Sequence, residues 1–169
     1  HDRLNQREID VIAREVFPEN GLRDISDRVG IVTPYRAQAD ALRHEAALGK
    51  AAADTVDKFQ GQERSTIIFS TVDNDISDFA DDDHRLNVAV SRAVNRLIVV
   101  TSGNKPTRRT SIGDLVSYIG YHSMEVTDSK VCSVFDLLYR QYADVRRQTL
   151  ARLKRVSQMD SENLMFGLI

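Results

Sequence analysis

Short runs of apolar residues alternate, over the first part of the chain, with segments in which apolar side chains recur every three or four positions. Continuous runs are typical of strands covered on both faces, and the spaced pattern is typical of amphipathic helices. The runs predict strands at Val29–Thr33, Ala53–Asp57, Thr66–Val72 and Arg96–Thr101. The spaced segments predict helices over residues 4–17, 37–48 and 86–94. Because strands and helices alternate, we expect an α/β fold with a mainly parallel sheet in three layers.

Polar residues, proline and glycine mark the ends of these elements. Asn5 followed by Glu8 suits the start of the first helix, with the asparagine as N-cap and the glutamate as its reciprocal acid. Pro34 suits the end of the first strand, because proline has no N–H to donate to a neighbouring strand. Gly49 suits the end of the second helix.

The pattern changes after Asn104. Residues 105–111 have the composition of a connection, residues 112–119 predict a short helix, and residues 131–156 predict a long amphipathic helix. We therefore expect one domain over residues 1–104 and a helical extension or linker over residues 105–169. The basic side chains of the long helix either contact a nucleic-acid backbone or form only its solvated face.

Composition narrows the class of protein only slightly. The chain has 169 residues, of which 41% are hydrophobic and 28% charged, and its net charge is −2, which is ordinary for a globular protein. The single cysteine, Cys132, rules out an internal disulfide and a cysteine-based zinc site, and it fits a reducing cytoplasm. No apolar run approaches the ~18 residues of a membrane span. We expect a cytoplasmic protein with no membrane partner, excised from a longer chain because it starts at His1.

An acidic segment precedes the last predicted helix of the sheet region. It contains six aspartates, namely Asp73, Asp75, Asp78, Asp81, Asp82 and Asp83. A divalent-ion site is conceivable, but the spacing lacks the Asp-x-Asp-x-Asp-Gly pattern of a calcium loop. We expect a solvated acidic loop, which would repel phosphates, and no metal site.

Two short blocks place polar residues where a core would not require them. The block Asp54–Glu63 has the sequence DTVDKFQGQE, and the block Leu86–Ala93 has the sequence LNVAVSRA. In the first, Gly61 permits a tight turn after a strand, and Glu63 is either solvated or a ligand contact. In the second, Arg92 either caps or salt-bridges its own helix or meets an anion.

These blocks resemble motifs V and VI of superfamily 1 helicases of the Upf1-like group. A third segment, Ile31–Gln38, has the sequence IVTPYRAQ and is similar to the Thr-Pro-Tyr-x-x-Gln element of that family. The three segments occur in family order, within a resemblance that covers residues 4–104. It implies a RecA-like fold of the P-loop NTPase type and the second of two motor domains, followed by a helical extension.

The resemblance implies an ATP site and a nucleic-acid site. Arg92 is the expected catalytic residue, an arginine finger that meets the charge on the γ-phosphate during phosphoryl transfer. Glu63 is expected to accept hydrogen bonds from the ribose of ATP, and Gly61 to let the backbone approach the nucleotide. Gln60 and Arg7 are the other expected ATP contacts. The expected nucleic-acid contacts are Thr33, Pro34, Tyr35, Thr55 and Val56.

The sequence departs from the family pattern at two places. Near the N-terminus the family has an arginine that touches the γ-phosphate; Gln6 holds that position here, and Arg7 follows it. A shift of one residue rotates a helical side chain by about 100°, so Arg7 is not an automatic substitute. In the second block, Val94 stands where the family often has another basic residue.

The sequence also lacks the phosphate-binding Gly-x-x-x-x-Gly-Lys-Ser/Thr motif, because Gly49-Lys50 has no glycine five positions earlier. By resemblance, ATP and Mg²⁺ would be held mainly by an N-terminal RecA-like domain of the same chain, outside this sequence. The expected function is ATP-driven movement along single-stranded DNA or RNA, and the fragment alone should be inactive. Two alternatives stay open: a catalytically inactive binding module, and a motor linked to a downstream nuclease of a restriction or repair protein.

Overall fold

The sheet of this protein has four parallel strands in the order β2-β1-β3-β4. The computed structural model describes residues 3–59, 61–73, 77–101, 109–122 and 125–131. Contacts divide the chain into two compact units, residues 1–131 and 132–169, and all described residues belong to the first. The strands are β1 (Val29–Thr33), β2 (Ala52–Thr55), β3 (Arg64–Ser70) and β4 (Ala93–Val100). The four predicted strands are thus confirmed, with β3 and β4 beginning two and three residues earlier than expected.

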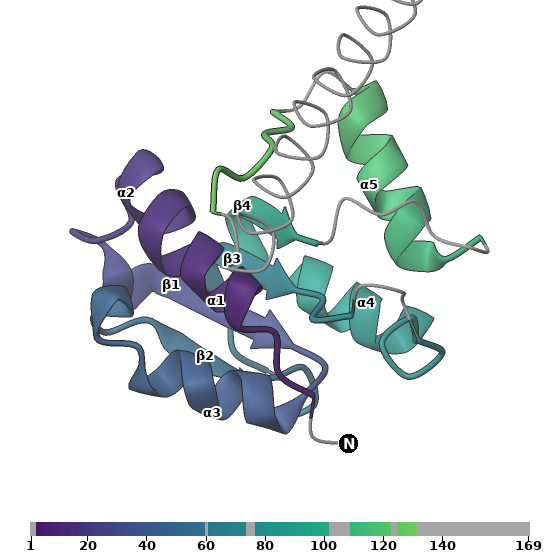
Figure 1. Ribbon diagram of the computed structural model, residues 1–169. Coiled ribbons are helices and arrows are strands. Elements are labelled where there is room, and N and C mark those ends of the chain that lie inside the picture. The colour runs from purple at the N-terminus through teal and green to yellow at the C-terminus, as the bar shows by residue number, and fades with distance from the viewer. Residues whose placement is uncertain (1–2, 60, 74–76, 102–108, 123–124, 132–169) are drawn as a thin grey trace, which may run out of the picture. The chain divides into compact units, whose positions relative to one another are not determined.

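Helices cover both faces of the sheet, so the predicted α/β fold in three layers is confirmed (Figure 1). One apolar cluster joins alternate strand residues such as Ile31 and Ile68 to the N-terminal helical segment and to α3 (Arg36–His44). The other joins Val32, Phe69 and their neighbours to α4 (Asp83–Ser91) and α5 (Ser111–Tyr121). Successive strand residues face opposite sides, so each strand contributes to both clusters.

The order of the strands explains why the helices lie on opposite faces. The chain leaves β1 through α3 to reach β2 on one side, and leaves β3 through α4 to reach β4 on the other. Right-handed connections that run in opposite directions across a sheet place their helices on opposite faces. β1 and β3 therefore flank the topological switch point of the sheet.

The predicted N-terminal helix is confirmed but is not a regular α-helix. It consists of α1 (Gln6–Val11), a π-helical turn (Ile12–Val16) and the short α2 (Phe17–Glu19). Ile9, Ile12 and Phe17 are all buried against the sheet. The wider π turn brings Ile12 and Phe17, which are five residues apart, onto the same face.

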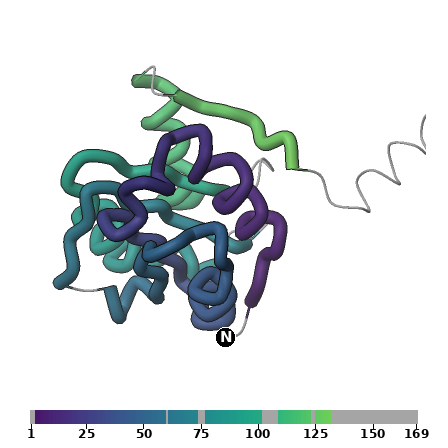
Figure 2. The backbone as a smooth tube through the Cα atoms, turned by 90° about the vertical axis from the view of Figure 1, so that its left-hand side faces the viewer, coloured from purple at the N-terminus to yellow at the C-terminus, as the bar shows by residue number. Residues whose placement is uncertain are grey.

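The expected capping pair at the start of α1 is half right. The side chain of Asn5 accepts a hydrogen bond from the backbone N–H of Glu8 at 3.2 Å, as an N-cap does. The expectation that Glu8 returns a bond to Asn5 is wrong, because Gln38 Oε1 accepts the Asn5 N–H at 2.8 Å instead. Glu8 points into the protein, so a residue of α3 takes its place at the cap (Figure 2 shows the N-terminal segment beside α3).

The remaining helices differ from the prediction at their ends. α3 ends at His44, because Glu45 adopts an extended conformation before a 3₁₀ turn at Ala46–Leu48. Gly49 ends that turn with φ of 61°, in the region that favours glycine. α4 begins at Asp83 rather than at Leu86, because the side chain of Asp82 accepts from Arg85 N and caps it.

The segment after the predicted domain boundary contributes to the same core. Ile112 of α5 is completely buried in the second apolar cluster, and Asp81 accepts a hydrogen bond from its backbone N–H at 3.0 Å. The boundary after residue 104 stays a prediction, and the helix expected over residues 131–156 lies almost entirely outside the described residues. Among the helices described, none is long and apolar enough to cross a membrane.

Candidate active site and nucleic-acid interface

The residues singled out by the sequence lie at the two opposite ends of the parallel strands. We call the end at which the strands begin the amino edge and the end at which they finish the carboxyl edge. Thr33 and Thr55 are paired at the carboxyl ends of β1 and β2. Gly61 and Glu63 precede β3, and Arg92 precedes β4, so these three lie at the amino edge. Phe69 pairs with Val32, the residue before Thr33, and lies five residues after Arg64 along β3. With a rise of ~3.3 Å per residue, the two edges are about 17 Å apart.

The turn that leads into β3 is held by backbone hydrogen bonds. The Phe59 N–H donates to Thr55 O at 2.9 Å, and the Gln62 N–H donates to Phe59 O at 3.1 Å. Gly61 has φ of 82°, and apart from Gly61 itself and its two chain neighbours no heavy atom lies within 4 Å of the position that a Cβ would occupy. Glycine is therefore favoured here by its backbone conformation, while the space beside it is open. Gln60 lies outside the described residues.

Replacing Gly61 should therefore cost backbone strain without a steric clash. We expect Gly61→Ala to lower the free energy of unfolding by about 1–2 kcal/mol, because a Cβ disfavours positive φ. Gly61→Asn is the matched control and should lose less, since asparagine tolerates this region better. Urea unfolding of both variants measures the difference, and equal stability of Gly61→Ala and the wild type would show that the turn relaxes.

Arg92 ends α4 and begins the approach to β4. Its backbone N–H donates to Ala89 O at 3.3 Å, and its carbonyl accepts from the Arg64 N–H at 3.1 Å. Among the described residues no carboxylate forms an ion pair with Arg92, and its Nε is buried without a hydrogen-bond partner. The described residues therefore do not form the structural salt bridge that was the alternative expectation for Arg92. A buried donor without a partner is costly, so this guanidinium is suited to an anionic ligand.

Glu63 lies at the same edge and is exposed. Its backbone carbonyl accepts from Arg64 Nη1 at 2.9 Å, so Glu63 and Arg92 are both bonded to the one residue Arg64. The structure thus brings together the predicted residues Gly61, Glu63 and Arg92. Arg64, which connects them, was not identified from the sequence; a basic residue directly after the Gln-Gly-x-Glu block was the available signal.

The predicted nucleic-acid contacts lie at the carboxyl edge and are mostly buried. Val56 N–H donates to Thr33 O at 3.1 Å, which joins the ends of the two strands. Thr33, Pro34, Tyr35 and Val56 are all buried, and only Thr55 of the five predicted residues is half-buried. At this edge, Thr55 and backbone atoms are therefore available to contact a nucleic-acid strand, whereas the side chains of Tyr35 and Val56 belong to the core.

Tyr35 is part of a polar network that the sequence did not predict. Its hydroxyl donates to Asp73 Oδ2 at 2.7 Å, Ser77 Oγ donates to the same oxygen at 2.7 Å, and Arg3 Nη1 pairs with Asp73 Oδ1 at 2.7 Å. Burial raises the pKa of Asp73, but the hydrogen bonds from Tyr35, Ser77 and Arg3 outweigh it, so the pKa lies below its ordinary value. The expectation of a wholly solvated acidic loop is therefore wrong for Asp73, which is 4% exposed.

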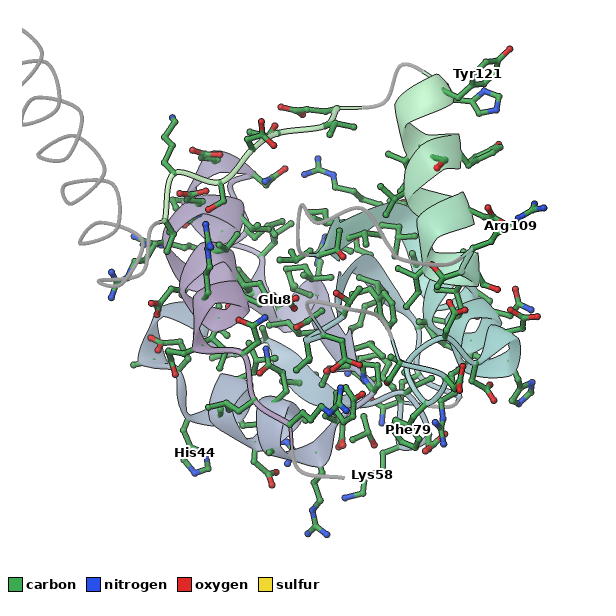
Figure 3. All side chains as sticks on the ribbon, turned by 45° about the vertical axis from the view of Figure 1, so that its right-hand side comes forward. Glu8, His44, Lys58, Phe79, Arg109 and Tyr121 are labelled. Atoms are coloured by element: carbon green, nitrogen blue, oxygen red, sulfur yellow. The ribbon has the colours of Figure 1, made fainter. Side chains whose placement is uncertain are left out.

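Glu8 of α1 is buried at the carboxyl end of β3, and Figure 3 shows it in the interior of the protein. Ser70 Oγ donates to its Oε2 at 2.6 Å, Thr71 Oγ1 donates to its Oε1 at 3.3 Å, and the Val72 N–H donates to both oxygens at 3.0 Å. Burial raises the pKa of Glu8 to about 7 in spite of these hydrogen bonds. The predicted ATP contact Arg7 lies on the exposed side of the helix while its neighbour Glu8 points inward, as the rotation between adjacent residues requires.

Comparison with protein families matches the model described as AAA domain (AAA_12) to residues 1–104. The chain is 36% identical over 106 residues to DNA replication ATP-dependent helicase/nuclease JHS1 of Arabidopsis thaliana, covering 58% of the chain and 8% of that protein. It is 38% identical over 97 residues to Helicase sen1 of Schizosaccharomyces pombe, covering 52% of the chain and 6% of that protein. It is 33% identical over 98 residues to DNA replication ATP-dependent helicase/nuclease DNA2 of Mus musculus, covering 54% and 9%. The chain therefore spans less than a tenth of the length of each of these relatives.

Proposed function

Because the chain belongs to the AAA domain family and carries the C-terminal motor domain of Upf1-like superfamily 1 helicases, we propose that it supplies the arginine finger and the ribose contact for ATP in a motor acting on single-stranded nucleic acid. The observation that carries this proposal is that Arg92 Nε is buried and, among the described residues, has neither a hydrogen-bond partner nor a carboxylate partner, while the Arg92 carbonyl accepts from the N–H of Arg64, directly after the Gly61–Glu63 turn. A structural arginine at this place would be expected to have a carboxylate partner.

Each residue of the amino edge has a role that fits its environment. The planar guanidinium of Arg92 can donate two parallel hydrogen bonds to phosphate oxygens and stabilise the charge that spreads over them during transfer. The exposed carboxylate of Glu63 can accept hydrogen bonds from two adjacent ribose hydroxyls. Gly61 leaves open space above the turn, so a nucleotide can approach its backbone.

The proposal places Mg²⁺ and most phosphate contacts on a first RecA-like domain, outside this sequence. No group of three acidic, histidine or cysteine side chains suited to a metal ion exists among the residues described. When bound by that other domain, Mg²⁺ would neutralise charge on the phosphates. Arg92 and Glu63 would complete the site from the opposite side of the cleft.

The distance between the two edges suggests how ATP and a strand could be coupled. The ATP residues lie at the amino ends of β3 and β4, and Thr55 lies at the carboxyl end of β2. Because the strands between them are rigid and hydrogen-bonded, rotation of the domain about the nucleotide moves the opposite edge as one body. In this proposal, closing on ATP shifts the grip of this domain on the strand, and hydrolysis releases it.

The test is ATP hydrolysis by the full-length protein, with and without single-stranded DNA or RNA. We expect turnover to rise when a strand is added, and the strand that stimulates more identifies the preferred nucleic acid. The 169-residue chain alone serves as a control and should show negligible turnover, because it lacks the phosphate cradle. Absence of turnover in the full-length protein would favour an inactive binding module, and robust turnover by the short chain would contradict the assignment to a second motor domain.

A nuclease-linked motor is the second candidate, and the names of relatives favour it. The relatives JHS1 and DNA2 are helicase/nucleases, whereas sen1 is named a helicase alone. The same incubations distinguish these possibilities when the labelled strand is analysed for shortened products. Shortening that requires the full-length protein would favour the nuclease-linked form.

A further inference from the structure

Arg64, the first residue of β3, hydrogen-bonds to Arg92, Glu63 and Gln62 at the proposed ATP edge. Its backbone N–H donates to Arg92 O at 3.1 Å. Its Nη1 donates to Glu63 O at 2.9 Å, and its Nη2 donates to Gln62 Oε1 at 3.4 Å. One residue therefore bonds both to the carbonyl of the proposed finger and to the turn that carries the proposed ribose contact.

The side chain of Arg64 is also held in place by packing. Its guanidinium carbon lies 5.8 Å from the ring centroid of Phe59, which is within the range of a cation–π contact. Its stem passes over Gly30, where an added Cβ would lie 3.0 Å from Arg64 Cγ and 2.6 Å from Phe59 Cζ. Gly30 thus leaves room for Arg64 and Phe59 together, and this packing restricts the directions in which the guanidinium can point.

The contacts of Arg64 do not resemble those of an ordinary structural arginine. Among the described residues it has no ion pair with a carboxylate, and its Nε is buried without a hydrogen-bond partner. Its two hydrogen-bond acceptors belong to the residues immediately before it. Because a buried unpaired donor is unfavourable, this arrangement costs stability, and stability alone does not account for an arginine at this position.

We propose that Arg64 is a positioning residue that holds the Gly61–Glu63 turn at a set distance from Arg92 and so determines how well the site selects nucleotides with both ribose hydroxyls. This inference rests on the proposed function of Glu63 and Arg92. The rigid fork of the guanidinium reaches the backbone carbonyl of Glu63 and the side-chain Oε1 of Gln62 at once, so it holds one backbone group and one side chain of the turn. Lysine would offer a point charge on a flexible stem and could hold the turn less firmly.

The experiment measures steady-state hydrolysis of ATP, 2′-deoxyATP and 3′-deoxyATP by the full-length protein in the presence of the stimulating strand. Arg64→Met keeps an unbranched stem over Gly30 and Phe59 but removes the donors, so it is the principal variant. Arg64→Lys is the conservative variant. Arg109→Met is the matched control, because Arg109 is 87% exposed and pairs with Asp114 of α5. Glu63→Gln changes the proposed ribose contact itself.

We expect Arg64→Met to raise KM for ATP about tenfold, the effect of losing a hydrogen bond to a charged group, while kcat falls by no more than about twofold. Its preference for ATP over either deoxy nucleotide should approach unity, as in Glu63→Gln, and the double variant should lose little more than either single one. Arg64→Lys should lie between Arg64→Met and the wild type. Arg109→Met should match the wild type in all three measurements.

Two results would overturn the inference. Full preference for ATP in Arg64→Met would show that the turn does not need Arg64 to hold its position. An unchanged KM with a large fall in kcat would assign Arg64 to phosphate binding instead. Thermal unfolding shows whether Arg64→Met has a folding defect. Such a defect lowers the active fraction for all three nucleotides equally, and this result would also count against a positioning role. A wild-type protein that hydrolyses no ATP would overturn the proposed function together with this inference, whereas an active wild type with unaltered Arg64→Met selectivity overturns the inference alone.

Discussion

Replacing Arg92 by alanine in the full-length protein should lower strand-stimulated ATP turnover by about 10³–10⁵-fold, the range measured for arginine fingers in other phosphoryl-transfer enzymes. The reason is that charge on the γ-phosphate oxygens increases during transfer, and a guanidinium without a competing carboxylate can meet it. Arg92 satisfies that condition among the described residues. The measurement is kcat with saturating ATP and strand, accompanied by the affinity of each variant for the strand.

Two further variants make the result specific to Arg92. Arg92→Lys keeps the charge but not the planar fork, so we expect most of the loss to remain. Arg96→Ala removes another arginine, four residues later on β4, whose Nη1 bonds to Asn20 Oδ1 at 3.1 Å. That variant should turn over ATP as the wild type does. Turnover in Arg92→Ala within a few-fold of the wild type would exclude the finger and leave Arg92 as the end of α4.

The second large effect concerns Glu8 and the dependence of stability on pH. The pKa of Glu8 rises from 4.5 to about 7 on folding, chiefly because its carboxyl is buried. Between these two values the folded chain holds a proton that the unfolded chain has released, so the free energy of unfolding falls as the pH rises. The stabilisation is fully present below the unfolded pKa and is lost above the folded one. Its limit is about 3 kcal/mol, from 1.36 kcal/mol for each unit of pKa.

The measurement is urea unfolding of the 169-residue chain between pH 4.5 and pH 8, for the wild type and for Glu8→Gln. Glutamine keeps the shape of the side chain and cannot ionise, so the fall in stability across this window should be largely absent from the variant. Glu19→Gln changes an exposed glutamate of α2 and should keep the wild-type slope. An identical slope in Glu8→Gln and the wild type would show that Glu8 does not carry the pH dependence.

The Asp73 network acts in a different range of pH. Because the pKa of Asp73 lies below its ordinary value of 3.8, its contribution to stability is present above that value and is lost as the pH falls through the lower, folded pKa. The contribution of Asp73 therefore changes mainly at lower pH than that of Glu8. Of these two carboxyl groups, Glu8 accounts for most of the change in stability above pH 4.5.

The environment of Val72 explains why the Glu8 contacts matter to the fold. Val72 has φ of 69°, which is strained for a β-branched residue, and its N–H donates to both oxygens of Glu8. Such strain of about 1–3 kcal/mol persists only where surrounding contacts hold it. Glu8 therefore connects the N-terminal helix to the carboxyl end of β3.

The sequence by itself determined the strands, the parallel α/β class and the family, and it singled out Gly61, Glu63 and Arg92, whose role in ATP binding stays a prediction. These features depend on local properties: apolar runs predict buried strands, a Gly-x-Glu block after a strand predicts a turn, and both patterns lie within a few consecutive residues. Gly61, Glu63 and Arg92 could be identified in this way because the family resemblance preserves their spacing.

Only the tertiary structure decided which polar residues are enclosed and which stay unpaired. Glu8 appeared to be a helix cap, but the packing of α1 on the sheet directs it toward Ser70 and Val72, more than sixty residues away. Tyr35 stays a predicted nucleic-acid contact, and only the tertiary structure showed that the return of the chain at Asp73 encloses its side chain. In the same way, the hydrogen bond from the Arg64 N–H to Arg92 O depends on the meeting of β3 and β4. Such contacts join segments far apart in the chain, so their energies depend on the packed fold and leave no local pattern in the sequence.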